Sequence, residues 1–259
     1  AADQYLKWTT SGSPSEVKPE FNGLAFIPDY KDWRPISTSE RWDNGTMRVI
    51  MGNPVAVKAI NEGHTSPWPD GTAFAKIAWK QLLHPSGEME AGEFIQVELM
   101  VKDKTNYAST DGWGWGRWKG DQLKPYGKDA SFVTECMHCH QPMKNNDFVF
   151  TLPVNWAEHV GAGTDTAAVE VFGWKAITSK IDKSRGTMSI LYGNDIAVDA
   201  ARRGVAYPAG AQLADVTWRQ REDEHWYGAN IPDSLVEVNM QRIGAEMAPL
   251  AAQRASVMP

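Results

Sequence analysis

The sequence predicts a mainly β (α+β) protein, in which an antiparallel β-sheet domain with a few helices is duplicated in tandem. Short runs of alternating apolar residues, bounded by Gly, Pro and Asn, predict the strands. Whole blocks of residues recur later in the chain at a nearly constant offset, which predicts the duplication. The 259 residues include 12 Trp, which suggests aromatic-rich packing in a β-protein.

The first block begins with a strand followed by a helix. Residues 46–51 are typical of a strand. Asn53 is a natural N-cap and Pro54 fits the first helical position. We therefore expect a helix over 54–62, ending at Gly63, which suits the residue after a helix C-terminus.

Further strands follow in the same block. Asp70-Gly71 marks a turn into a second strand over 73–79. A third strand is expected over 94–101, where alternate residues are apolar. The aromatic, glycine-rich segment 112–116 is expected to form a bent strand or a loop.

The same order recurs after residue 170, with a strand, a helix that ends at a glycine, and two more strands. Register is kept over whole blocks, apart from one loop that is two residues shorter in the second copy. The matched pairs are Gly52 with Gly193 and Gly63 with Gly204, 141 residues apart, then Pro69 with Pro208, Trp79 with Trp218 and Glu98 with Glu237, 139 residues apart.

Composition and length set the domain organisation. With 42% hydrophobic and 22% charged residues, the chain can bury an ordinary globular core. We expect an N-terminal arm over 1–20, a first domain over 21–156 and a degenerate second domain over 157–259. The net charge of −6 argues against nucleic acid as a partner. No apolar run approaches the roughly 18 residues of a membrane-spanning helix.

A C-x-x-C-H motif lies near the end of the first copy and uses both cysteines of the chain. This motif is typical of covalent c-type haem attachment. We expect Cys136 and Cys139 to form thioethers with the haem vinyl groups and His140 to bind the iron. The alternatives are half of a zinc site, which would need further ligands, or a chance match. The second copy lacks the motif and should carry no haem.

Covalent haem attachment normally takes place outside the cytoplasm. The chain begins Ala1-Ala2-Asp3, which suits a mature N-terminus after cleavage at small residues. We therefore expect a periplasmic protein.

The first copy resembles the cytochrome P-460 family over roughly 28–156, and residues 172–242 resemble a second, haem-less copy of the same domain. The resemblance depends on the order and spacing of several short pieces. They are Asp29-Tyr30-Lys31-Asp32-Trp33, Asp70-Gly71-Thr72 followed by Lys76, Met100-Val101-Lys102-Asp103, Asp111-Gly112-Trp113, Cys136-Met137-His138-Cys139-His140 and Asp147-Phe148-Val149-Phe150.

The resemblance implies one haem held against an antiparallel sheet, with a His-ligated iron that is open on its distal side. It also implies oxidation of hydroxylamine or a similar small nitrogen compound, with electrons passing to a redox partner protein. The alternatives are nitric oxide binding or sensing, as in the related cytochrome c′-beta, and simple electron transfer. Family members are often homodimers, so the second copy is expected to form a pseudo-dimer with the first within one chain.

The resemblance assigns Lys76 to the position of a lysine that bonds to a meso carbon of the porphyrin. Otherwise Lys76 would lie near the haem without a bond, or point to solvent. One face of the strand over 73–79 changes between the copies, and we expect this face to look at the haem. Its residues and their partners are Phe74 with Leu213, Lys76 with Asp215, and Ala78 with Thr217.

Other residues are weaker candidates for the site. Glu98 could accept a proton from a substrate, but Glu237 keeps the same place in the haem-less copy, which favours a structural role. Aromatic residues around the motif either close the haem pocket or belong to the sheet core. They are Trp113, Trp115, Phe148 and Phe150.

Overall fold

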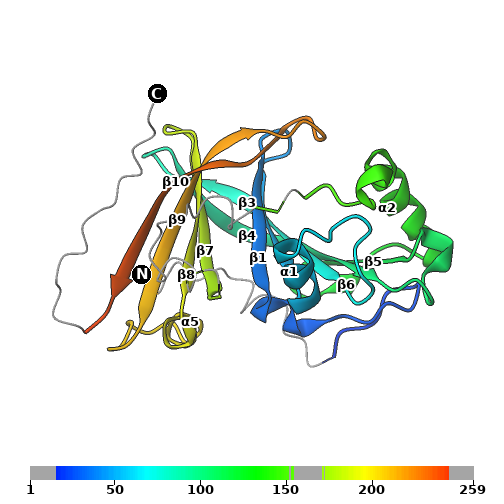
Figure 1. Ribbon diagram of the computed structural model, residues 1–259, viewed down its shortest axis with the longest axis horizontal. Coiled ribbons are helices and arrows are strands. Elements are labelled where there is room, and N and C mark those ends of the chain that lie inside the picture. The colour runs from blue at the N-terminus through cyan, green and yellow to red at the C-terminus, as the bar shows by residue number, and fades with distance from the viewer. Residues whose placement is uncertain (1–15, 152, 155–170, 172, 245–259) are drawn as a thin grey trace.

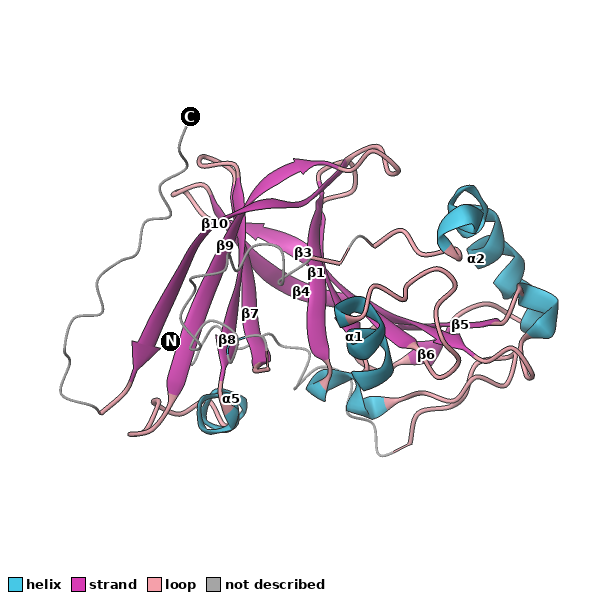
Figure 2. Cartoon of the chain, in the orientation of Figure 1, coloured by secondary structure: helices cyan, strands magenta, loops and turns pink. Residues whose placement is uncertain are grey.

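The computed structural model describes residues 16–151, 153–154, 171 and 173–244. This part of the chain consists mainly of strands (Figure 2). The strands are β1 (Arg34–Arg41), β2 (Thr46–Gly52), β3 (Ala73–Leu83), β4 (Glu88–Lys102), β5 (Trp113–Lys119), β6 (Lys124–Pro125), β7 (Lys175–Asp182), β8 (Thr187–Gly193), β9 (Gln212–Glu222) and β10 (Ala229–Arg242). The helices are α1 (Pro54–Asn61), α2 (Val133–His140) and α5 (Asp195–Arg202), with 3-10 turns η3 (Pro28–Asp32), η4 (Ala108–Thr110), η5 (Ala130–Phe132) and η6 (Gln141–Asn146). None of these helices is long and apolar enough to cross a membrane.

The described strands form one 10-stranded antiparallel sheet, in the order β3-β2-β1-β10-β9-β8-β7-β4-β5-β6. Because β3 also pairs with β4, the sheet closes on itself, and β5 and β6 extend it beyond β4 (Figure 1). Closure leaves few open strand edges, which are otherwise sites of unwanted pairing. The prediction of a mainly β fold with a few helices is confirmed.

The element order β1–β2–α1–β3–β4 recurs as β7–β8–α5–β9–β10. The two equivalent helices begin with the same cap. Asn53 Oδ1 accepts a hydrogen bond from Ala56 N at 2.9 Å, and Asn194 Oδ1 accepts one from Ala197 N at 3.0 Å. Each cap satisfies a backbone donor that the first helical turn leaves free. The repeat seen in the sequence is therefore a repeat of structure.

The two repeats join through symmetric contacts. β1 pairs with β10, and β4 pairs with β7 in the equivalent position. Where β1 meets β7, the hydroxyls of Thr38 and Ser179, which are equivalent residues 141 positions apart, lie 3.1 Å from each other. Contact between equivalent residues is the mark of a two-fold axis. The second repeat thus continues the sheet of the first rather than packing away from it.

Several strands are longer than their apolar patterns predict. The strand expected over 73–79 continues to Leu83, and the one expected over 94–101 begins earlier, at Glu88. Near the hairpin tip both strands carry exposed side chains, which interrupt the apolar alternation but not the backbone ladder. Of the segment 112–116, residues 113–116 belong to a strand, β5, and Gly112 lies in the turn before it.

The main core fills the inside of the closed sheet and draws on both repeats. The equivalent residues Trp79 and Trp218 are both fully buried in it. A second, smaller apolar cluster lies on the opposite face of β2 to β5 and includes Phe74, Trp113 and Phe148. The alternation of side chains along β3 separates the two clusters, and the smaller one supports the candidate site.

The N-terminal arm predicted over 1–20 lies mostly outside the described residues. Its last residue, Glu20, is buried, and its carboxylate accepts hydrogen bonds from Arg117 N at 2.8 Å and Tyr126 N at 3.1 Å. The chain is therefore fastened to β5 before the first strand begins. The predicted domain boundary at 156–157 falls outside the described residues.

Candidate functional site

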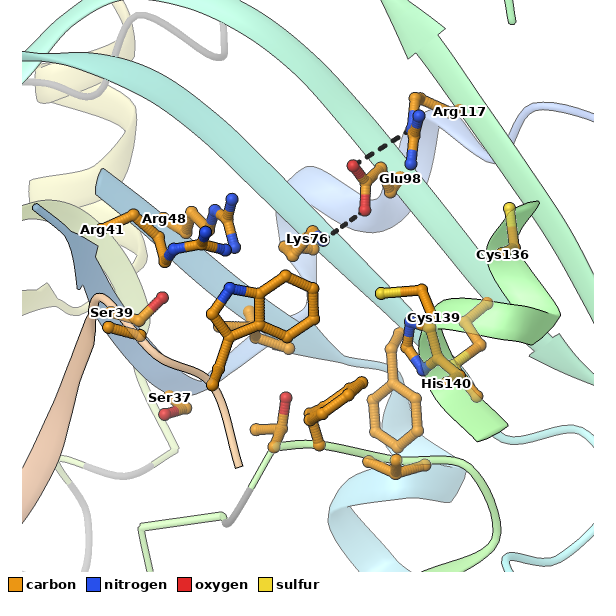
Figure 3. A pocket seen from close by; sticks show the side chains of 18 of the residues that line it. Ser37, Ser39, Arg41, Arg48, Lys76, Glu98, Arg117, Cys136, Cys139 and His140 are labelled. Carbon is orange, nitrogen blue, oxygen red and sulfur yellow. Dashed lines mark ion pairs between the residues drawn. The ribbon is translucent and has the colours of Figure 1, made fainter. Parts of the chain in front are cut away.

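A cavity of about 420 Å³ lies between helix α2 and the outer face of the sheet (Figure 3). Its walls come from β1 to β5, from α2, from the segment after η6 and from the hairpin of β9 and β10. This volume is within the range of cofactor and small-molecule sites. The cavity thus brings together segments that are far apart in the sequence.

The C-x-x-C-H motif is part of helix α2, and the two cysteines and the final histidine of the motif all line the cavity. Cys136, Cys139 and His140 are spaced i, i+3 and i+4, which places them on one face of a helix. Both thiols are free. In the described part of the chain, no group of three or more His, Cys, Asp or Glu side chains is arranged to hold a metal ion, as a zinc site would require.

His140 is held in one orientation and one tautomer. Its Nδ1 lies 2.6 Å from the carbonyl oxygen of Phe148. Because a carbonyl only accepts, Nδ1 carries the hydrogen and Nε2 keeps its lone pair. Burial lowers the pKa of His140 to about 4, so the imidazole is neutral at physiological pH. The rings of Trp115 and Phe150 lie 4.5 Å and 5.0 Å from it.

A mostly buried carboxylate, Asp147, positions the carbonyl that holds His140. It forms an ion pair of 2.7 Å with Lys102, whose side chain is only 3% exposed. It also accepts hydrogen bonds from Trp68 N at 2.9 Å and from the indole of Trp113 at 3.3 Å. Asp147 and the next residue both have positive φ, which turns the chain back toward α2. Trp113 therefore supports the site from behind rather than lining it.

Three charged residues face the cavity side by side on β3, β4 and β5. Lys76 is paired in register with Glu98, and Glu98 with Arg117. Glu98 forms ion pairs with both, and its distance to Arg117 Nε is 3.2 Å (Figure 3). Burial would raise the pKa of Glu98, but the charges of Lys76 and Arg117 outweigh it and lower the pKa to about 2.

Lys76 and Phe74, which lie on the strand face that changes between the repeats, both line the cavity. Burial lowers the pKa of Lys76, against the opposing effect of Glu98. Of the four aromatic candidates, Trp115 and Phe150 line the cavity. Phe148 contributes through its backbone carbonyl instead.

Sequence reasoning missed two arginines on the cavity wall, Arg41 and Arg48. The buried Nε of Arg48 has no hydrogen-bond partner among the described residues. A guanidinium with an unsatisfied N–H can bind a ligand that carries carboxylates, and the propionates of a haem are such carboxylates. A comparison of the two copies could have indicated Arg48. Like Lys76, it is a cation in the copy that carries the haem motif, and it is replaced in the other copy, by Ser189.

The second repeat also contributes to the cavity, which sequence reasoning did not foresee. The contributing residues, all in or beside the turn between β9 and β10, are Asp223, Trp226, Ala229 and Ile231. No pattern within the first copy could indicate them, because the contact depends on how the repeats pair.

Comparison with known families gives a match that covers both repeats. The family model for Cytochrome P460 matches residues 27–151 and 171–248, which correspond to the two repeats. No curated protein sequence matches the chain. The family implies a haem cofactor, and the neutral His140 with its free Nε2 fits the axial ligand of one. With most of its length matched, the chain belongs to the cytochrome P460 family.

Proposed function

We propose that the protein is an exported cytochrome with a single, covalently bound c-type haem, which oxidises hydroxylamine or a similar small nitrogen compound. The observation that supports this proposal is the placement of both cysteines and His140 along one wall of a cavity. The same cavity holds the lysine that the family resemblance assigns to the haem edge.

Each residue has a distinct part in this proposal. Cys136 and Cys139 would bind the vinyl groups as thioethers, and His140 would bind the iron through Nε2. The guanidinium of Arg48 would pair with a propionate. The bound haem would supply the redox centre that takes electrons from the substrate. The protein would hold the centre rigidly, since Asp147 fixes the segment behind His140.

Glu98 is better suited to balance charge than to accept a substrate proton. Its carboxylate is already paired with Lys76 and Arg117, and its pKa of about 2 makes it a weak base at neutral pH. The sequence offset was wrong about the equivalent of Glu98 in the second repeat. Lys76 pairs with Glu98, whereas the equivalent Asp215 pairs with Asn239, because the longer β9–β10 turn shifts β10 by two residues.

Lys76 is proposed to form the crosslink to the porphyrin. The bond would join the Lys76 nitrogen to a meso carbon. One hydrogen would leave each atom as a proton, and the two electrons would pass to an added oxidant of the peroxide class. Burial supports the proposal, because it lowers the pKa of Lys76 and so favours the neutral amine that bond formation needs.

A second candidate function is nitric oxide binding without turnover. The ion pair between Lys76 and Glu98 favours it, because an amine held as ammonium by a carboxylate does not form the crosslink. Export and transfer of electrons to a redox partner protein belong to the proposal as well, since covalent haem attachment takes place outside the cytoplasm.

The test is to produce the protein in cells that mature c-type cytochromes and to compare Lys76→Leu with Lys80→Leu. Lys80 lies on the same strand but is exposed and paired with Glu93. The proposal predicts hydroxylamine-dependent reduction of an electron acceptor by the wild type and by Lys80→Leu. Lys76→Leu should lose this activity and the mass signature of a haem-linked lysine peptide.

Other results would select other functions. A wild type that binds nitric oxide but leaves hydroxylamine unoxidised, with no crosslinked peptide, would support the second candidate. A six-coordinate, low-spin spectrum without ligand binding would contradict both and indicate an electron carrier.

A further inference from the structure

The turn between β9 and β10, residues 223–228, reaches from the second repeat to the cavity of the first. Its equivalent in the first repeat is the turn between β3 and β4, residues 84–87. The two turns dock in the same way. Trp42 N donates to Gly228 O at 2.9 Å, and the equivalent Lys183 N donates to Gly87 O at 3.2 Å.

The two turns nevertheless differ in length. The turn of the second repeat is two residues longer, so the offset between the copies returns from 139 to 141 residues at Gly87 and Gly228. The longer turn is the one that docks on the repeat carrying the C-x-x-C-H motif. The longer turn also carries an aromatic pair, Trp226 and Tyr227, at the positions where the shorter turn has Pro85 and Ser86.

The two aromatic residues point to different places. Trp226 lines the cavity, with its ring 4.6 Å from the guanidinium carbon of Arg41 and 5.0 Å from the ring of Phe150. Phe150 in turn lies 5.0 Å from the ring of His140. Tyr227 is 83% exposed and packs against Trp42 outside the cavity.

A rigid chain of rings thus runs from the second repeat to the expected axial ligand. An aromatic side chain in a cavity wall excludes volume and does so at small entropic cost, because it has only two rotatable bonds. Arg41 holds the face of the indole, and Arg41 is itself tied to Asp43 by an ion pair. The wall is therefore fixed from both repeats.

We propose that Trp226 is a specificity-determining residue that limits the size of ligand able to share the cavity with the cofactor. The second repeat, which has no haem motif of its own, acts as the permanent partner that supplies this wall. The inference rests on the proposed function only in requiring that the cavity takes a haem, and not on the reaction.

The test uses the full-length holoprotein with Trp226→Ala and, as a matched control from the same turn, Tyr227→Ala. Haem content is measured first, and then the affinities of the ferric protein for imidazole and for the smaller cyanide ion. Trp226→Ala should raise the imidazole-to-cyanide affinity ratio by about tenfold, the scale on which a pocket wall discriminates by size. Tyr227→Ala should leave the ratio unchanged.

An unchanged ratio in Trp226→Ala, with haem fully bound, would overturn the inference and leave the proposed function intact. If Trp226→Ala fails to retain haem, Trp226→Phe replaces it, and a ratio that does not rise has the same meaning. A wild type that takes up no haem would instead overturn the proposed function, and this inference with it.

Discussion

At the scale of single residues, the site depends on His140 being fixed by a backbone carbonyl. Replacing His140 with Ala should leave the thioethers in place, because Cys136 and Cys139 are untouched, but remove the proximal ligand. The visible spectrum should change to that of a weakly ligated haem, and added imidazole should restore it. His138→Ala, an exposed residue of the same motif, should keep the wild-type spectrum. A normal spectrum in His140→Ala would contradict the assignment.

Glu98 makes stability depend on pH at the acid end. Its folded pKa of about 2 lies below the unfolded value of about 4.3. Its stabilising contribution is therefore complete above the unfolded pKa and is lost as the pH falls from about 4.3 toward 2.

Urea unfolding at pH 6 and pH 3 measures this effect. Glu98→Gln should be less stable than wild type at pH 6, on the order of 2 kcal/mol, and the difference should shrink at pH 3. Glu237→Gln, which removes an exposed carboxylate from β10, is the control and should lose much less stability at pH 6. An equal loss at both pH values for Glu98→Gln would contradict the linkage.

At the scale of elements, the ion pair of Asp147 with Lys102 connects the segment after α2 to strand β4. Asp147→Asn keeps the shape of the side chain, and Asn tolerates the positive φ at this position. The variant leaves the buried ammonium of Lys102 without a negatively charged partner. The free energy of unfolding should fall by about 3–5 kcal/mol. Glu62→Gln, which breaks an exposed pair with Lys58, should cost much less stability, because solvent screens an exposed pair.

The double variant Lys102→Met/Asp147→Asn separates charge from packing and keeps a residue that tolerates the positive φ at position 147. It should recover much of the stability, because no charge is then left buried without a partner. A double variant as unstable as Asp147→Asn would show that the loss does not come from an unpaired charge.

At the scale of the whole molecule, the two repeats form one closed sheet with a two-fold relation, and close packing at the β9–β10 turn locks them together. A Cβ added to Gly228 would lie 2.5 Å from Asp43 Cβ, at a φ of +82°. Gly228→Ala should therefore be less stable than Gly186→Ala, whose φ of +62° is similar but whose surroundings are open.

Both variants place an alanine at a positive φ, so the difference between their stabilities measures the contact of Gly228 with Asp43. Gly186→Ala should lose about 1 kcal/mol and Gly228→Ala clearly more, by thermal or urea unfolding. Equal losses would mean that the turn shifts freely and that the repeats are not locked at this point.

Much of this arrangement could be predicted from the sequence. Asn53 and Pro54 define a helix start through local backbone chemistry, and the constant offsets between Gly52 and Gly193 reveal the repeat. The contrast of Lys76 with Asp215 identified the strand face that lines the cavity. These signals are local, or they compare one segment with its own copy.

The rest depends on contacts between distant segments. Trp226 reaches the cavity only because β10 pairs with β1, and no periodicity within either strand encodes that pairing. The carbonyl of Phe148 becomes the partner of His140 through two residues with positive φ, which side-chain patterns do not reveal. The strand end past Trp79 was missed because the residues there are mostly exposed and do not alternate between apolar and polar, although the backbone ladder continues.

The central claim is that Cys136 and Cys139 bind a single haem covalently in this cavity, and extraction tests it most directly. Protein from cells that mature c-type cytochromes is precipitated with acidified acetone and weighed by intact-mass spectrometry. The account predicts a coloured precipitate and a mass increased by one haem, both lost in Cys136→Ala/Cys139→Ala. Colour that passes into the acetone, or a wild-type mass equal to that of the bare chain, would contradict it.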